Sequence, residues 1–246
     1  MGDPDRRPAF YAAGPGGWRD WWTVLHPPYT AWHLSYVVIG ASLVSRLDGP
    51  RLLLSVGAFF AAVGVAAHAL DERHDRPLRT QIPDRSLTFA VVVGLAVAVG
   101  LGVVDAFVVG WGLVPFLVIG PLLVVAYNLE LFGGIVHTDV GFAASWGAFP
   151  VLAGYAGQQG TMSVAAVAAA IGAFALSYAQ RALSTPARQL RRRVDQVEGT
   201  VTLLDGSIEQ LDVERLLAPL ERALRALTWA TVALAVALVL GHVARP

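Results

Sequence analysis

One stretch of this chain limits what it can fold into more than any other feature. Between Ser86 and Gln180 the only formally charged residues are Asp105, Glu130 and Asp139. Crossing the hydrocarbon core of a bilayer takes roughly 20 apolar residues in a helix, so this stretch is long enough for several crossings. The whole chain is 55% hydrophobic and only 15% charged, unlike an ordinary soluble domain. The sequence therefore predicts an integral membrane protein.

The expected fold is all-α, because lipid offers no hydrogen-bond partner to open backbone groups. Apolar runs predict about seven transmembrane helices, near residues 30–47, 52–70, 87–104, 107–127, 138–156, 162–180 and 226–243. Four parts are expected along the chain: an interfacial segment over 1–25, a transmembrane core over 26–183, a cytoplasmic hairpin and amphipathic helix over 184–225, and a last transmembrane helix over 226–246. The alternating stretch "GTVTLLDGSIEQLD" (199–212) is typical of a β-hairpin turning at Asp205-Gly206.

The arginines predict the orientation. The loops after the second and the sixth span hold Arg73, Arg76, Arg79, Arg85, Arg181, Arg188 and Arg191 to Arg193. Positively charged loops stay in the cytoplasm, so the N-terminus is expected there too and the protein in the cytoplasmic membrane. The expected partner is a membrane lipid or isoprenoid substrate, and no nucleic acid. The oligomeric state stays open, because Gly- and Ala-rich spans permit close packing within or between chains.

A cluster of titratable residues ends the second span. On a helix four side chains fall at i, i+3, i+4 and i+7 and share one stripe: His68, Asp71, Glu72 and Asp75. Four more candidates are expected at similar depth on other spans: His33, Glu130, His137 and Asp139. Mixed imidazole and carboxylate ligands suit Fe²⁺, Mn²⁺ or Zn²⁺, whereas carboxylates alone suit Mg²⁺. The alternative is a solvated helix end whose acids pair with neighbouring arginines.

Three segments resemble the UbiA superfamily of intramembrane prenyltransferases. They are "HPPYTAWHLSYVVIGASL" (26–43), "AHALDERHDRPLRTQIPDRSL" (67–87) and "YNLELFGGIVHTDVGFAASWGAFPVLAGYAG" (127–157). The second is similar to the family's first aspartate motif, N-D-x-x-D-x-x-x-D, with Asp71 and Asp75 at its last two acids. Ala67 and His68 stand at its first two positions, the chain has no Lys, and "LSYAQRALSTPAR" (176–188), at the second aspartate motif, has no acid.

The resemblance implies a bundle of transmembrane helices that handles an isoprenyl diphosphate with Mg²⁺. It places Asp71 and Asp75 at the metal, with a cationic clamp drawn from Arg73, Arg76, Arg79 or Arg181. Tyr127 and Trp146 are the expected substrate contacts. A cavity with an aromatic and aliphatic wall is also expected, with Trp146, Phe149 and Tyr155 among its residues.

Three functions remain open at this point. The first is a UbiA-like enzyme that uses a His- and carboxylate-bound metal on a lipid or isoprenoid, with ligands drawn from His68, Glu72 or Asp71, Glu130, His137 and His33. The second is a minimal Mg²⁺-dependent prenyltransferase, and the third a non-catalytic lipid-binding or assembly protein. Iron, manganese or zinc that survives purification favours the first, Mg²⁺-dependent diphosphate binding favours the second, and the absence of both favours the third.

The orientation can be tested directly, because the chain has no Cys. We expect a single Cys introduced at Gln81 or Gln189 to react with an impermeant thiol reagent only when the cytoplasmic side is opened. Labelling of either position from outside intact cells would contradict the predicted orientation.

Overall fold

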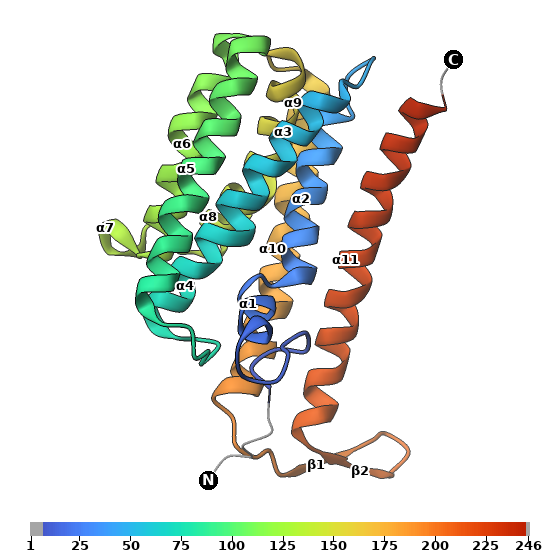
Figure 1. Cartoon of the computed structure of the whole chain (residues 1–246). Helices are drawn as coiled ribbons and strands as arrows, with labels where there is room; N and C mark the ends of the chain where they lie inside the picture. The colour runs from blue at the N-terminus through green and yellow to red at the C-terminus, as the bar shows by residue number, and fades with distance from the viewer. Residues whose placement is uncertain (1–6, 245–246) are drawn as a thin grey trace.

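The computed structural model describes residues 7–244, and within them the chain is almost entirely helical (Figure 1). The elements, in chain order, are α1 (Trp18–Val24), α2 (Pro27–Ala41), α3 (Gly49–Phe59), η1 (Phe60–Ala67), α4 (His68–Asp75), α5 (Asp84–Val109), η2 (Trp111–Leu113), α6 (Val114–Asn128), α7 (Leu131–Gly134), α8 (Asp139–Ala143), η3 (Ala144–Ala148), α9 (Phe149–Gln159), α10 (Val164–Arg192), β1 (Gly199–Thr202), β2 (Ile208–Leu211) and α11 (Val213–Val243).

Five helices are long and apolar enough to cross a membrane: Gly49–Asp75, Asp84–Val109, Trp111–Asn128, Val164–Arg192 and Val213–Val243. Their length and composition indicate an integral membrane protein, and they coincide with five of its seven predicted spans. The other two predicted spans are also helical but are not among these five. One is α2, which has only 15 residues, and the other is the continuous helix of α8, η3 and α9, which contains several Gly, Ser and Gln residues.

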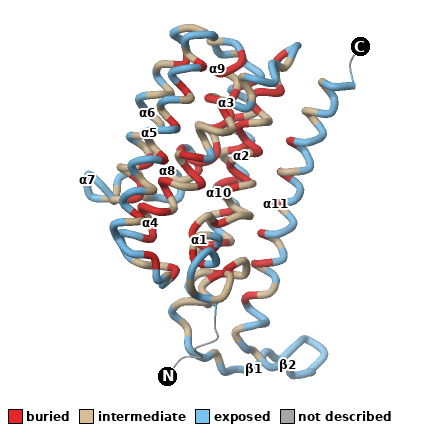
Figure 2. Tube along the Cα trace, viewed as in Figure 1, coloured by how far each residue is buried: buried red, intermediate tan, exposed pale blue. Residues whose placement is uncertain are grey.

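The centre of the bundle is the contact between α2 and α9, where Figure 2 shows much of the burial. A Cβ added at Gly40 would lie 2.0 Å from the carbonyl oxygen of Val151, and one at Gly154 would lie 2.2 Å from that of Val37. Each helix thus brings a glycine against the backbone of the other, as small residues do between membrane helices. The two backbones can approach this closely only because both positions lack a side chain.

The polar segment near the C-terminus is more helical than predicted. The hairpin is confirmed, with β1 and β2 antiparallel, and the Asp212 side chain caps the next helix by accepting from the backbone N–H of Arg215. The predicted break near 226 is absent, since α11 runs without interruption from Val213 to Val243. At the other side of the hairpin, α10 continues to Arg192. Pro186, close to the expected boundary at 184, and Pro219 are both accommodated within the helices.

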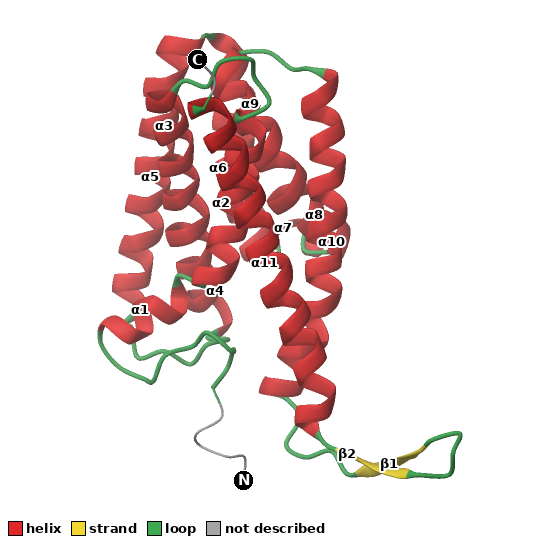
Figure 3. Cartoon of the chain, turned by 90° about the vertical axis from the view of Figure 1, so that its right-hand side faces the viewer, coloured by secondary structure: helices red, strands yellow, loops and turns green. Residues whose placement is uncertain are grey.

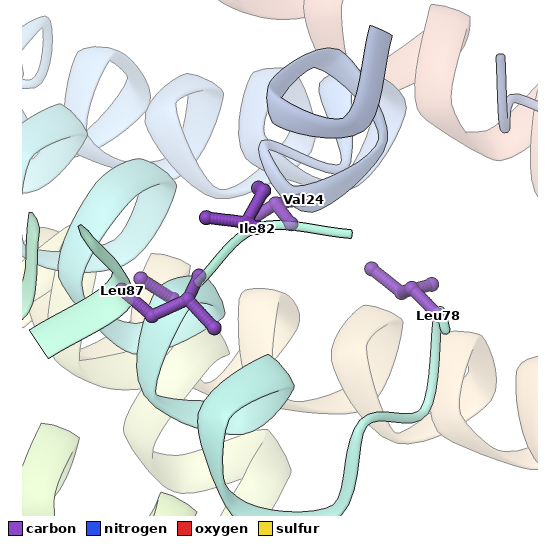
Figure 4. Packing of buried hydrophobic residues seen from close by; sticks show 5 residues of the cluster. Val24, Leu78, Ile82 and Leu87 are labelled. Atoms are coloured by element: carbon purple, nitrogen blue, oxygen red, sulfur yellow. The ribbon is translucent and has the colours of Figure 1, made fainter. Parts of the chain in front are cut away.

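Both ends of the hairpin lie at the end of the bundle where α1 also lies, as Figures 1 and 3 show. There Val24 of α1 packs with Leu87 of α5 and with Leu78 and Ile82 of the connecting loop (Figure 4). This cluster of buried side chains ties α1 to the loop between α4 and α5. It therefore holds the residues that follow η1 in place at one end of the molecule.

The close contact of α2 and α9 predicts a sharp response to a single methyl group. Gly154→Ala should lower the apparent Tm in detergent, because overpacking a tight contact costs about 1–3 kcal/mol. Gly100→Ala on α5 is the control, since a Cβ there meets nothing within 4 Å and alanine favours the helix. Thermal unfolding followed by circular dichroism measures both, and equal stability of the two variants would contradict the packing.

Candidate functional site

A cavity of about 340 Å³ opens at the end of the bundle that carries the arginines. Its walls come from almost every part of the fold: the segment before α1, α2, η1, α4, the end of α6, the loop after it, α8, η3, α10 and α11. Such a site cannot exist before the whole bundle is assembled. Polar and charged side chains from helices far apart in the sequence meet there.

Two π-helical segments flank the cavity. η1 leads directly into α4, and η3 interrupts the helix between α8 and α9. Wider turns of this kind are rare and frequently occur at functional sites. Val63 and Ala67 of η1 and Trp146 of η3 line the cavity, so both irregular segments place side chains at its wall.

Histidines form one side of the cavity. The rings of His26 and His68 are stacked with their centroids 4.3 Å apart. His26 Nδ1 lies 2.6 Å from the carbonyl oxygen of Val24. Burial lowers the pKa of His26 from its ordinary value near 6.5 to about 4, so this imidazole is neutral at pH 7. Tyr11 packs against His26, and burial raises the pKa of the Tyr11 phenol.

Arginines of α10 form the opposite side. Arg191 pairs with the buried Glu221 of α11, and Arg181 pairs with Asp139 at 3.0 Å. Arg188 donates to Ser184 and Thr185, and Arg192 donates to the carbonyl oxygen of Pro8.

Within residues 7–244 no carboxylate forms an ion pair with Arg188 or Arg192. Asp71 also lines the cavity, and the charges of both arginines partly offset the rise that burial causes in its pKa. Both arginines line the cavity, and neither contacts an acid of residues 7–244.

The cavity also collects polar atoms that lack partners. Six buried side-chain nitrogen or oxygen atoms in the described residues have no hydrogen-bond partner, and three of them belong to residues that line this cavity: His68 Nδ1, the Tyr127 hydroxyl and Gln180 Oε1. Leaving such groups unsatisfied costs free energy. Their gathering at one place is what a site that receives a polar ligand requires.

An apolar pocket of about 80 Å³ adjoins the polar cavity. It lies among α3, η1, α5, α6, η3 and α9, and Val63 and Trp146 line both spaces. Phe149 lines the apolar pocket as expected, whereas Tyr155 lines neither space. Asp105 and Ser55 lie in its wall as well and approach each other at 3.4 Å. The two spaces together make a site with one cationic and one apolar end.

The predicted metal ligands do not converge. Among residues 7–244 no three His, Asp or Glu side chains are close enough to hold a metal ion, so the expected grouping of His68, Glu130 and His137 is not formed. Glu130 and His137 are neighbours at 3.7 Å, and the Nδ1 of His137 lies 3.0 Å from the carbonyl oxygen of Tyr127. His33 Nδ1 lies 2.8 Å from the carbonyl oxygen of Trp146. The rings of His33 and His137 thus each lie against a backbone carbonyl. The ring of His68 stacks on that of His26.

Glu72 has a structural position. Its carboxylate accepts hydrogen bonds from the backbone N–H groups of Leu78 and Thr80 and from the Thr80 hydroxyl, and the residue is fully buried. It therefore fastens the loop after α4 and does not line the cavity. Asp71 and Asp75, from the same predicted stripe, do line it.

The predicted cationic clamp is only partly formed. Arg181 lines the cavity, with its guanidinium 5.4 Å from the Phe142 ring centroid. Arg73 and Arg79 are exposed and do not line it. Arg76 instead bonds the carbonyl oxygens of Thr80 and Ile82 and pairs with Asp84. The helix ends with a left-handed residue at Arg76.

Sequence reasoning missed several residues of the cavity. His26, which precedes Pro27-Pro28, is not among the predicted ligands, Tyr29 is not among the predicted site residues, and Arg188 and Arg192 predicted only the orientation of the chain. A signal was present, because Arg181, Ser184 and Arg188 are spaced by three and four residues, as on one face of a helix. Ending the sixth span at residue 180 concealed that α10 continues through them.

Comparison of the chain with protein-family models, curated proteins and solved structures finds no match.

The structural position of Glu72 predicts the effect of its removal. Glu72→Ala should lower the apparent Tm by several degrees, because an unsatisfied buried donor costs about 1–3 kcal/mol. A chelator should leave this loss unchanged. Asp75→Ala, at an exposed position one turn away, is the control and should leave Tm close to that of the parent protein. A loss for Glu72→Ala that disappears after metal removal would contradict the structural role.

Proposed function

We propose that this protein is a UbiA-like intramembrane enzyme that binds an isoprenoid or related lipid with a diphosphate head group. In this proposal α2 and the helix from Asp139 to Gln159 complete a bundle of about seven spans, and the arginine-bearing end faces the cytoplasm. The observation that carries the proposal is the junction of a cationic cavity with an apolar pocket at Val63 and Trp146.

The head group is assigned to the cavity. Arg188 and Arg192 line it without an ion-pair partner in the described residues, and the charges of both act on Asp71, which also lines it. Guanidinium groups match phosphate oxygens with two parallel donors, which makes Arg the preferred residue for such recognition. A cavity of about 340 Å³ at the membrane boundary has room for a diphosphate.

The hydrocarbon part is assigned to the apolar pocket. Its wall combines Phe59, Phe116 and Phe149 with aliphatic side chains. An isoprenoid whose head contacts Arg188 would pass Val63 and Trp146 to reach this pocket. The two ends of the site thus match the two ends of an amphipathic substrate.

Asp71 and Asp75 are the residues that would hold Mg²⁺. They lie one helical turn apart on α4 and line the same cavity. One or two carboxylates with substrate phosphates and water are the usual protein environment of Mg²⁺, so a group of three protein ligands is not required. Bound Mg²⁺ would neutralise charge that develops on a departing diphosphate. Arg188 and Arg192 would stabilise the same charge in a site shielded from bulk water.

A non-catalytic lipid-binding role is the second candidate. The observation that favours it is the limited acidic content of the cavity. Its carboxylates are Asp71, Asp75, Glu130 and Glu221, of which Glu221 is already paired. An assay for release of diphosphate from a bound allylic substrate separates the two candidates, since a binding protein releases none.

The head-group assignment predicts a specific loss of affinity. Farnesyl diphosphate should bind the purified protein in the presence of Mg²⁺, and Arg188→Gln should weaken binding about tenfold or more, as expected for a charge-assisted hydrogen bond. Isothermal titration measures both. The control is Arg222→Gln, an exposed arginine of α11 that lines no described cavity.

One further ligand and one further variant sharpen this test. Farnesol, which lacks the diphosphate, should bind weakly and equally to the parent protein and to Arg188→Gln. Asp71→Asn should remove the Mg²⁺ dependence of diphosphate binding. Equal affinity of Arg188→Gln and Arg222→Gln for farnesyl diphosphate would contradict the proposed function.

A further inference from the structure

A third hollow lies on the outside of the bundle, apart from the candidate site. It has a volume of about 660 Å³ and runs between α5 and the helix made of α3 and η1. Both helices are candidate membrane spans. Its walls include the exposed side chains of Phe60, Phe89, Val93 and Val97, so it faces the lipid and shares no residue with the polar cavity.

The length of this groove indicates what fills it. On α5 it extends from Ser86 to Val97, which at the rise of an α-helix is about 16 Å. One leaflet of the hydrocarbon core is about 15 Å deep. A transmembrane helix of a partner or of a second copy would cross the full core of about 30 Å. A groove that spans one leaflet fits an acyl chain better than a helix.

One end of the groove carries a positive charge. Arg85 lies there beside Trp21 and Ser86, and it is exposed. In residues 7–244 no acid forms an ion pair with it, because the adjacent Asp84 pairs with Arg76. The acid next to it in sequence is thus paired with Arg76, and no ion pair within residues 7–244 competes with an anion for Arg85. Trp side chains favour the same depth, where head groups meet hydrocarbon.

We propose that this groove is a binding site for one anionic phospholipid, with the phosphate of the head group on Arg85 and one acyl chain along Phe89, Val93 and Val97. In the proposed orientation this end lies in the cytoplasmic leaflet, which is the anionic one. The floor of the groove is made by small residues such as Ala61 and Gly94. They let a chain lie close to both helices.

The test is native mass spectrometry of the full chain with phosphatidylglycerol and phosphatidylcholine of identical acyl chains. The first bound lipid should be phosphatidylglycerol, and Arg85→Gln should reduce that preference about fivefold, the effect of one basic residue near a membrane surface. Arg222→Gln is the matched control and should keep the preference. An equal effect of the two substitutions, or equal binding of both lipids by the parent protein, would overturn the proposal.

The acyl-chain part has its own pair of variants. Val93→Trp should fill the groove and reduce the occupancy of both lipids, whereas Val92→Trp should not, since Val92 is exposed but does not line the groove. Equal occupancy in the two variants would overturn the assignment. Displacement of the lipid by inorganic phosphate alone would also do so. These variants leave Arg188 unchanged, so an unaltered affinity for farnesyl diphosphate distinguishes this site from the proposed active site.

Discussion

The close contact of α2 and α9 is the constraint on which the rest of the molecule depends. Lipid supplies no hydrophobic force to press helices together, so close backbone approach and van der Waals contact must do so. With Gly40 against Val151 and Gly154 against Val37, α2 is fixed at the centre of the bundle. Because α2 carries His33 and begins beside His26, the same contact sets the position of the histidine side of the cavity. It also places η3, which precedes α9, so that the carbonyl oxygen of Trp146 meets His33.

Around that centre some charged side chains join segments of the fold, and others line the cavity. Glu72 secures the loop after α4, Arg76 bonds within the same loop and to Asp84, and Arg191 joins α10 to α11 through Glu221. Arg188 and Arg192 form no ion pair with a carboxylate of the described residues. Desolvated cations without a counter-charge are costly, and an anionic ligand offsets that cost. This difference between neighbouring arginines of one helix is the reason for assigning the head group to α10.

The sequence predicted those features that follow from composition and local pattern. The hairpin turning at Asp205-Gly206 and the Asp212 cap depend on neighbouring residues, and the structure confirms both. The five long apolar helices agree with the predicted membrane character. The candidate site was predicted only in part. The stripe of His68, Asp71, Glu72 and Asp75 lies on one helical element as expected, but helical spacing does not say which element each side chain meets. Glu72 faces a loop and His68 meets His26, and both outcomes depend on contacts between segments distant in sequence.

The arginines of α10 are a second case in which the local sequence did not predict the role of a side chain at the site. The many arginines in the predicted loops indicate the orientation of the chain, because orientation depends on the positive charge of the loops. Their role at the cavity depends on α10 continuing as a helix to Arg192, through a Pro at position 186 that local rules would treat as a break. A proline is tolerated in such a helix when neighbouring groups satisfy the freed carbonyl. Once the helix continues, Arg181 and Arg188 are two turns apart on one face, and the polar end of α10 becomes a wall of the cavity where the sequence indicated a loop.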